Sequence, residues 1–143
     1  KGGLMALHLI KLCVGIDDLE ELEALRAKRR KTEKRLFVHT RNTPKRREEL
    51  LDGGSLFWVI RSQIRARQRI LGITSDVDEE GRPHCLIELD WKVIPTEVVP
   101  WKPFQGWRYL EAKDAPPDRF FGLAEDDDLP PAMARELREL GLI

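Results

Sequence analysis

Apolar and polar residues change their spacing several times early in the chain, and each change predicts a new element. Residues Ala6–Val14 place apolar side chains on both faces, which is typical of a central, well-covered strand. Asp17 follows as a candidate helix cap, and we expect a helix from there to Lys31–Glu33, with its charged face in solvent. Its narrow apolar stripe consists of three leucines spaced three apart: Leu19, Leu22 and Leu25.

A second strand and a short helix come next. The segment Arg35–Arg41 returns to strand alternation. Thr43 and Pro44 then form a helix-start signal, with the threonine as cap and the proline at the first helical position. The pattern predicts about two helical turns over Lys45–Leu51, ended by the Asp52-Gly53-Gly54 turn.

The middle of the chain predicts two adjacent strands of different character. Ser55–Ile60 is apolar on both faces, so we expect Trp58 in the core. After Ser62 the alternation becomes strict, and every second residue is an arginine. Because side chains alternate across a strand, Arg65, Arg67 and Arg69 should share one face.

Turn residues divide the rest of the chain into shorter pieces. Asp78–Pro83 predicts a hairpin turn, and His84–Leu89 the returning strand. Val93–Val99 is extended, although Pro95 interrupts it, and Pro103–Leu110 is loop-like sequence with three aromatic residues. We expect a surface tail rich in proline and acid from Asp114 onward and a final short helix over Ala132–Leu140.

About six short strands with two early helices and a short C-terminal helix favour an α+β fold. We expect a small mixed or barrel-like β-sheet. The 143 residues predict one domain over residues 5–143, with its acidic, proline-rich tail from about residue 114. Lys1–Leu4 is interpreted as a cloning remnant, because the strand pattern begins at Met5.

Composition narrows the class of protein. Apolar residues make up 41% and charged residues 35% of the chain, as in ordinary globular proteins. No apolar run reaches the ~18 residues of a transmembrane helix, and we expect a cytoplasmic protein without a membrane partner. Cys13 and Cys85 lie among aliphatic residues and are predicted to be reduced and buried. The cysteines and histidines do not have the spacing of metal ligands, and the sequence contains no cofactor-binding motif. We therefore expect neither a metal nor a cofactor.

The formal net charge of zero conceals strong segregation. Residues 26–47 contain eleven Lys or Arg and one acid, Glu33. Acids gather instead in three segments: Asp17–Glu23, Asp76–Glu80 and Glu125–Asp128. The molecule is therefore expected to be a dipole whose basic pole attracts an anionic partner such as nucleic acid.

The order of the expected elements resembles that of the PUA-like superfamily, which includes EVE- and ASCH-type domains. In EVE-type chains a strand end reading V-R-N, a short helix, a G-D turn, an aromatic strand and an I-x-G strand follow one another. Their counterparts here are Val38–Asn42, Lys45–Leu51, Gly53-Gly54, Leu56–Ile60 and Ile70-Leu71-Gly72, with Gly54 in place of the aspartate. The resemblance implies a PUA-like fold and binding of RNA or a modified base, and a few ASCH-type members are hydrolases.

A more specific resemblance runs from Met5 to Asp118. The phrases MALHLIKLCVG, PKRREELLDGGSLFWVI, RQRILG and PFQGWRYL resemble an uncharacterised bacterial family of proteins of unknown function, DUF1489. This resemblance implies a bacterial source and carries no biochemical knowledge with it.

The shared face of Arg65, Arg67 and Arg69 is the first candidate binding surface. Three guanidinium groups on one face repel one another unless carboxylates, phosphates or water lie between them. An anionic ligand is one interpretation. The other is internal pairing with Glu88 or Asp90 of the neighbouring strand, or with the acidic loops.

The second candidate surface combines a basic loop with aromatic residues. Its loop residues Arg41, Asn42, Lys45 and Arg46 lie where PUA-like relatives place part of their ligand-facing loop, and could equally form a solvated basic helix. Exposed aromatic rings beside an arginine can stack on bases. Trp101 and Trp107, with Arg108, are the candidates for a cage around a base. Phe104 and Tyr109 are instead expected to fill the open end of the small barrel.

Three functions remain open from the sequence. A non-catalytic module that holds RNA or a modified nucleotide is the leading hypothesis. A small hydrolase of modified nucleosides would need a trio such as Thr40, Lys45 and Glu48, whose spacing fits no strict rule. The third hypothesis is a protein–protein adaptor that pairs through its acidic tail and basic pole.

Overall fold

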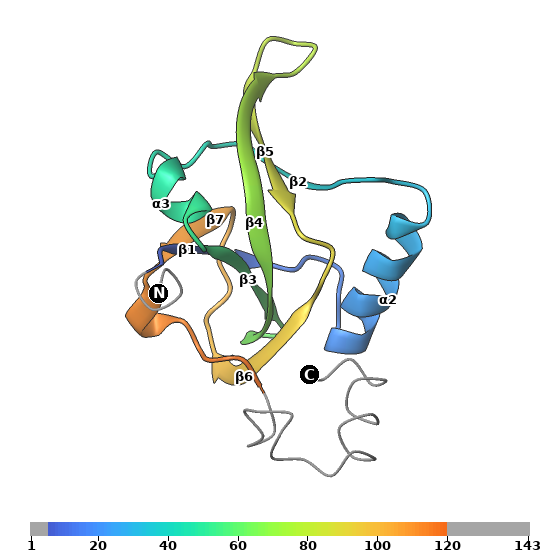
Figure 1. Cartoon of the computed structure of the whole chain (residues 1–143), viewed down its shortest axis with the longest axis vertical. Helices are drawn as coiled ribbons and strands as arrows, with labels where there is room; N and C mark the ends of the chain where they lie inside the picture. Colours follow the sequence, from blue (N-terminus) through green and yellow to red (C-terminus); the bar gives the residue numbers. More distant parts are fainter. Residues whose placement is uncertain (1–5, 120–143) are drawn as a thin grey trace.

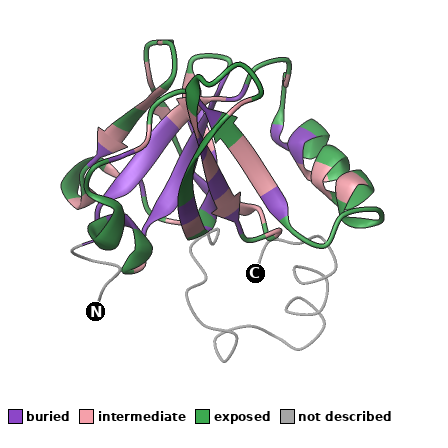
Figure 2. Cartoon of the chain, turned by 90° about the horizontal axis from the view of Figure 1, so that it is seen from above, coloured by how far each residue is buried: buried purple, intermediate pink, exposed green. Residues whose placement is uncertain are grey.

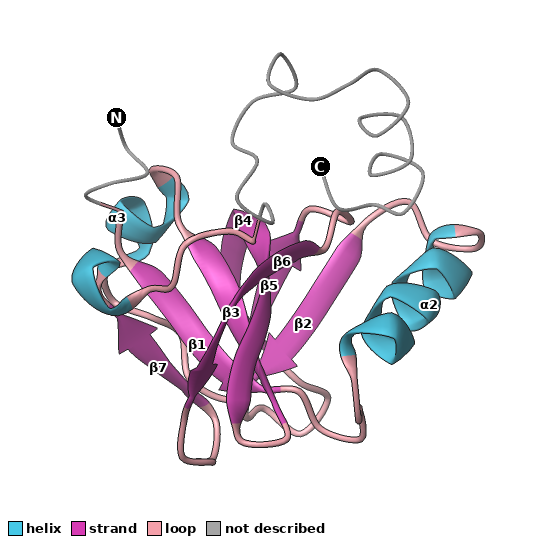
Figure 3. Cartoon of the chain, turned by 90° about the horizontal axis from the view of Figure 1, so that it is seen from below, coloured by secondary structure: helices cyan, strands magenta, loops and turns pink. Residues whose placement is uncertain are grey.

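The computed structural model describes residues 6–119, which form a mixed α+β structure dominated by one seven-stranded sheet with two helices (Figures 1 and 3). In chain order the elements are β1 (His8–Leu12), α2 (Leu19–Arg30), β2 (Leu36–Thr40), α3 (Arg47–Leu51), β3 (Ser55–Ile60), β4 (Gln63–Val77), β5 (Pro83–Leu89), β6 (Ile94–Pro100), β7 (Trp107–Leu110) and a 3-10 turn (Ala112–Asp114). The two helices lie toward opposite ends of the sheet, and both contribute leucines, Leu22 and Leu50, to one core cluster. The α+β class is as predicted.

The strand order along the sheet is β2-β5-β4-β3-β1-β7, and β6 pairs with β4 beside this path. β1 and β3 are parallel, and every other pairing is antiparallel. The sheet is open, because its end strands β2 and β7 do not pair with each other in the described chain. Seven strands replace the expected six, since part of the loop-like segment forms β7 against β1, with Tyr109 opposite Leu9.

β4 is the longest strand and the centre of the sheet. It spans 15 residues and pairs with β3 and β6 along its first half and with β5 along its second. Its register with β5 shifts between Ile70 and Gly72, where a β-bulge allows the strand to bend. Beyond the bulge, β4 and β5 continue into the predicted hairpin, which projects past the rest of the chain (Figure 1).

α2 begins one residue later than the sequence indicated. Asp18, rather than Asp17, is the N-cap, and its carboxylate accepts the backbone N–H of Glu21 at 2.8 Å. The Glu21 carboxylate reaches back to the N–H of Asp17, also at 2.8 Å. Leu19 and Leu22 are buried, whereas Leu25 is 41% exposed. The buried leucines of α2 therefore lie in its first turns (Figure 2).

The predicted start of the second helix is wrong. α3 begins at Arg47 and not at Pro44, and its N-cap residue, Arg46, makes no side-chain capping bond. Thr43 does not cap it, because the Thr43 hydroxyl instead accepts a 3.1 Å hydrogen bond from Ser75 of β4. The helix ends as predicted, at Asp52 and at Gly53, whose φ of +90° is left-handed.

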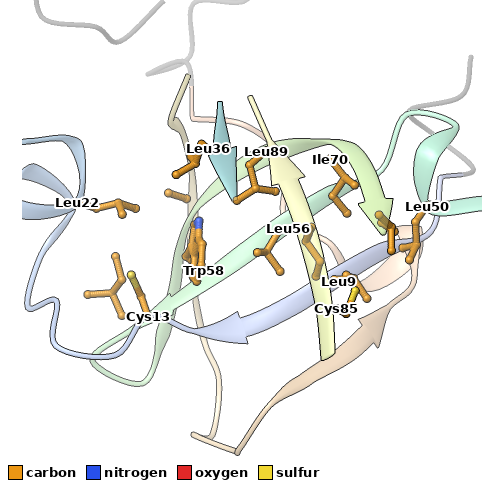
Figure 4. Close-up of a cluster of buried hydrophobic side chains, with 14 of the residues drawn as sticks. Leu9, Cys13, Leu22, Leu36, Leu50, Leu56, Trp58, Ile70, Cys85 and Leu89 are labelled. Carbon is orange, nitrogen blue, oxygen red and sulfur yellow. The ribbon is translucent and has the colours of Figure 1, made fainter. Parts of the chain in front are cut away.

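The core has one cluster on each face of the sheet. The larger cluster contains Leu9, Leu56, Trp58 and Ile87 and extends to Leu22 of α2 (Figure 4). The smaller cluster consists of Ile10, Phe57, Val59, Ile64 and Leu110. Every residue of β3 is buried, which confirms that this strand is covered on both faces and that Trp58 belongs to the core.

The first part of the predicted tail returns to the sheet. Asp118 forms an antiparallel bridge with Thr96 of β6, and the N–H of Glu97 donates to the carbonyl of Pro117 at 2.9 Å. The predictions for residues 1–4, for the acids at 125–128 and for the helix over 132–140 lie outside the described residues.

Candidate functional site

The loop after β2 meets β7, although these segments belong to opposite ends of the sheet. The indole N–H of Trp107 donates to the carbonyl oxygen of Asn42 at 2.8 Å. The backbone N–H of Arg46 donates to the Tyr109 hydroxyl at 3.1 Å, and the Arg46 guanidinium lies 5.5 Å from the centre of the Tyr109 ring. The structure thus brings together three residues of the predicted site: Asn42, Arg46 and Trp107.

The charges near this junction are partly neutralised within the protein. Arg46 makes two 2.7 Å hydrogen bonds with the carboxylate of Glu49. An open hollow of about 650 Å³ is lined by residues 43–49, which include Lys45, Arg47 and Glu48. Arg41 is exposed and lines no hollow described in this part of the structure.

The residues of the hydrolase hypothesis are not arranged as a trio. Thr40 is buried, and its hydroxyl donates to the carbonyl of Asn42 at 3.0 Å. Lys45 and Glu48 are both exposed. Within residues 6–119, no hydrogen bond links Thr40 to either of them.

Arg67 and Arg69 of β4 line one hollow, whereas Arg65 lies where the register with both neighbouring strands shifts, between Ile64 and Ala66. Arg67 is the most engaged of the three arginines. Two hydrogen bonds of 2.7 and 2.8 Å join its guanidinium to Asp118, and a third, of 2.7 Å, reaches the hydroxyl of Ser55. Internal pairing therefore applies to Arg67, although its partner is neither Glu88 nor Asp90. Arg65 and Arg69 form no ion pair with a residue in the described range.

A buried histidine lies behind this pair. The Nδ1 atom of His8 accepts the backbone N–H of Ser55 at 3.0 Å, and the His8 side chain is almost inaccessible. Burial, and secondly the charge of Arg67, lowers the pKa of His8 from 6.5 to about 4. His8 is consequently neutral at physiological pH. Through its bonds to Asp118 and Ser55, Arg67 holds the segment after β7 against β3 and β4.

The predicted aromatic cage is divided between the two core clusters. Trp101 and Phe104 pack against the smaller cluster, and Arg108 lies over the Phe104 ring at 4.7 Å. Trp107 and Tyr109 pack against the larger cluster and contact each other edge to face, with ring centres 5.0 Å apart. The candidate stacking residues Trp101 and Trp107 therefore do not lie in one pocket.

A separate hollow lies between α2 and the connection from β5 to β6. Its volume is about 420 Å³, and four of its eight lining residues are cations. The lining consists of Glu23, Arg26, Ala27, Arg30, Lys31, Trp91, Lys92 and Val93. None of the four cations forms an ion pair with a carboxylate of residues 6–119. We refer to this feature as the α2 hollow.

Buried hydrogen bonds hold the floor of the α2 hollow in place. The amide oxygen of Gln68, which is fully buried, accepts from the Arg26 Nε at 3.2 Å and from the Trp58 indole at 3.0 Å. The amide nitrogen of Gln68 donates to the carbonyl of Asp90 at 2.9 Å. A single side chain thus fixes α2, β3 and the start of the β5–β6 connection relative to one another.

The aromatic wall of the α2 hollow is also fixed. The indole N–H of Trp91 donates to the carbonyl of Lys34 at 3.2 Å, which sets the orientation of the ring. Burial lowers the pKa of Arg26, whose guanidinium lies 5.6 Å from the centre of the Trp58 ring. Arg30, Lys31 and Lys92 are exposed and place positive charges at the rim of the hollow.

Sequence reasoning missed the α2 hollow because it assigned the charged face of α2 to solvent and did not single out Trp91. One signal was available: Glu23, Arg26 and Arg30 are spaced three and four apart, so they share one side of a helix. The partner wall, Trp91-Lys92, follows a strand about 65 positions away, and only the fold brings the two together.

The cysteines and histidines form no metal site. Within residues 6–119 there is no group of three or more His, Cys, Asp or Glu that could hold a metal ion. Cys13 and Cys85 are buried free thiols, as predicted, and burial raises the pKa of Cys13 to about 11. The Cys13 thiol is therefore a poor nucleophile at neutral pH.

Comparison with known proteins adds one match. A family model described as "Protein of unknown function (DUF1489)" matches residues 9–143. No curated protein and no solved structure matches the chain. Among the helices in the described part of the chain, none has the length and apolar character required to cross a membrane.

Proposed function

Since the chain belongs to the DUF1489 family of proteins of unknown function, we propose from its structure that it is a cytoplasmic, PUA-like binding module for RNA or a modified nucleotide. The α2 hollow is the binding site in this proposal. The ligand class and its location rest on the chemistry of the residues that line the hollow.

The observation that carries the proposal is a set of four cations, beside one aromatic ring, that have no carboxylate partner among residues 6–119. Arg26, Arg30, Lys31 and Lys92 repel one another in the free protein, and a phosphate group relieves this repulsion. Trp91 adds a flat apolar surface on which a base can stack, a contact worth about 1–3 kcal/mol per base. Phosphate and base together match a nucleotide better than they match a simple anion.

The curvature of the sheet supports the PUA-like part of the proposal. Although the sheet is open, its two ends are linked by the hydrogen bonds from Trp107 to Asn42 and from Arg46 to Tyr109. A sheet whose ends are joined by side chains is close to a barrel in form. The order of the elements, which resembles EVE-type domains, is consistent with this form.

The other basic surfaces are weaker candidates for the primary site. Arg46 and Arg67 already have carboxylate partners, Glu49 and Asp118. The hollow that contains Arg67, Arg69 and Lys92 also contains Asp52 and Asp90, so two of its three positive charges are offset. Arg41 and Lys45 lie in the connection from β2 to α3 and do not line the α2 hollow, so they would contact only a longer nucleic acid.

Titration of single-stranded RNA over a range of salt concentrations tests the proposal. Affinity should fall steeply with salt, because binding releases counterions from the RNA. The double substitution Arg30→Ala with Lys92→Ala should lower affinity at low salt and reduce the slope of log K against log salt by about 1.4, or about 0.7 for each lost phosphate contact.

Lys28→Ala provides a matched control, because Lys28 is exposed on α2 and does not line the hollow. It should leave both affinity and slope near those of the wild type. Absence of RNA binding at low salt would contradict the proposed function. If the double variant and the wild type bind RNA equally well, the RNA-binding site does not lie in the α2 hollow.

A further inference from the structure

The α2 hollow contains one acidic residue, Glu23, among its four cations. Glu23 is half-buried and makes no hydrogen bond or ion pair with a residue of the described chain. Its nearest helical partner, Arg26, is already held by Gln68 and lies over Trp58. The carboxylate is therefore available to a ligand.

An unpaired carboxylate in this position opposes the binding of a simple anion. Burial raises the pKa of Glu23, and the charge of Glu20 raises it further, so the surroundings disfavour the ionised form. Partly buried carboxylates normally have hydrogen-bond donors, because desolvation without partners is unfavourable. A ligand that brings its own N–H donors supplies what the protein does not.

We propose that Glu23 recognises a guanine base within the RNA or nucleotide bound in the α2 hollow. This inference rests on the proposed function and specifies the base. The guanine ring stacks on Trp91, and its phosphates contact Arg30, Lys31 and Lys92. The two oxygens of the Glu23 carboxylate accept from the guanine N1–H and 2-amino groups.

Guanine is the base whose edge fits a carboxylate. Its Watson–Crick edge presents two adjacent donors, N1–H and the 2-amino group, which match the two oxygens of one carboxylate. Adenine and cytosine each present an amino donor next to a ring-nitrogen acceptor, and uracil presents one donor between two acceptors. An acceptor that faces a carboxylate is repelled, so these bases form at most one favourable hydrogen bond.

The test compares short single-stranded oligouridylates that carry one central guanine, adenine, cytosine or inosine. These RNAs all carry the same number of backbone charges, so a difference in affinity between them reports on the central base. Wild-type protein should bind the guanine RNA on the order of tenfold more tightly than the adenine and cytosine RNAs. Inosine keeps N1–H but lacks the 2-amino group, and its RNA should bind with intermediate affinity.

Glu23→Gln should abolish the guanine preference, because the amide presents one acceptor and one donor where the guanine edge needs two acceptors. Glu20→Gln is the matched control: Glu20 lies on the same helix and does not line the hollow, so this variant should keep the preference. Equal wild-type affinity for all four substituted RNAs overturns the inference about Glu23 and leaves the proposed function standing. Failure to bind any of the RNAs overturns both.

Discussion

Trp107 and Asn42 join the two ends of the open sheet through one hydrogen bond, from the indole N–H to the backbone carbonyl at 2.8 Å. Trp107 belongs to β7, the last strand in the sheet order, and Asn42 follows β2, the first. No backbone ladder closes the sheet between them within residues 6–119. The link between the two ends of the sheet is therefore made by side chains at this junction.

Trp107→Phe should destabilise the protein, because it removes this hydrogen bond and keeps most of the ring packing. Since the Asn42 carbonyl can be solvated after the change, the expected loss is about 1 kcal/mol in the free energy of unfolding. Urea denaturation measures it. Trp101→Phe is the control, because the Trp101 indole forms no hydrogen bond with a described residue. An equal loss in both variants would assign the effect to ring size.

Gln68→Leu should be more damaging. The substitution removes a fully buried amide that pairs with Trp58, Arg26 and the carbonyl of Asp90. The buried Trp58 indole would then lack its partner, and the part-buried Arg26 guanidinium and Asp90 carbonyl would lose theirs, at a total cost of about 3 kcal/mol. Chemical denaturation should show this loss, and RNA affinity should fall as well, since the floor of the α2 hollow loosens. Gln63→Leu, at the start of the same strand, should have a much smaller effect on both.

His8 should make the protein acid-sensitive. Its folded-state pKa of about 4 lies below the ordinary value of 6.5, so between these pH values the unfolded chain binds a proton that the folded chain does not. Stability is unaffected above pH 6.5, falls as the pH drops toward about 4, and levels off below that value. The total loss is about 3 kcal/mol.

The matched variant for this effect is His8→Asn, which keeps an acceptor for the N–H of Ser55 and does not titrate. The difference in unfolding free energy between wild type and variant, measured at pH 7 and pH 4, isolates the contribution of His8. The wild type should lose about 3 kcal/mol more than the variant across this range. If the unfolding free energies of wild type and variant change in parallel between pH 7 and pH 4, then protonation of His8 does not destabilise the folded protein.

Gly54→Ala should be strongly destabilising. A Cβ atom at this position would lie 2.3 Å from the carbonyl oxygen of Leu7 and 2.4 Å from that of Leu50, and neither backbone atom can move freely. We expect a loss of about 3 kcal/mol or more in thermal or chemical unfolding. At Gly72 the added methyl would meet only the Glu88 side chain, at 3.5 Å. Gly72→Ala should therefore be neutral or slightly stabilising.

The period of the apolar pattern was sufficient to predict β3, β4 and the hairpin that follows, because these elements depend on neighbours in sequence. It was insufficient for β7. Four residues rich in aromatic side chains carry little periodic signal, and they form a strand only because β1, about 100 positions earlier, offers a free edge. The start of α3 was missed for a similar reason: Thr43 is engaged by Ser75 of a distant strand.

The same limit applies to binding residues. Arg67 and Arg69 line one hollow, as alternation predicted, but alternation could not show the register shift at Arg65 or that Asp118 would neutralise Arg67. Nor could spacing bring Trp91 next to α2. The glycine at position 54 does have a local explanation, because no side chain fits between the carbonyls of Leu7 and Leu50.

The position of β1 also constrains how the chain can fold during synthesis. β1 pairs with β3, about 45 residues later, and with β7, about 100 residues later. A growing chain on the ribosome can form the β3–β4 and β4–β5 hairpins early, since their partners are local. Its first strand, however, retains an uncovered edge until Trp107–Leu110 has emerged. For most of translation, this apolar strand is thus open to mispairing with other chains, and a chaperone that binds extended apolar segments would recognise it.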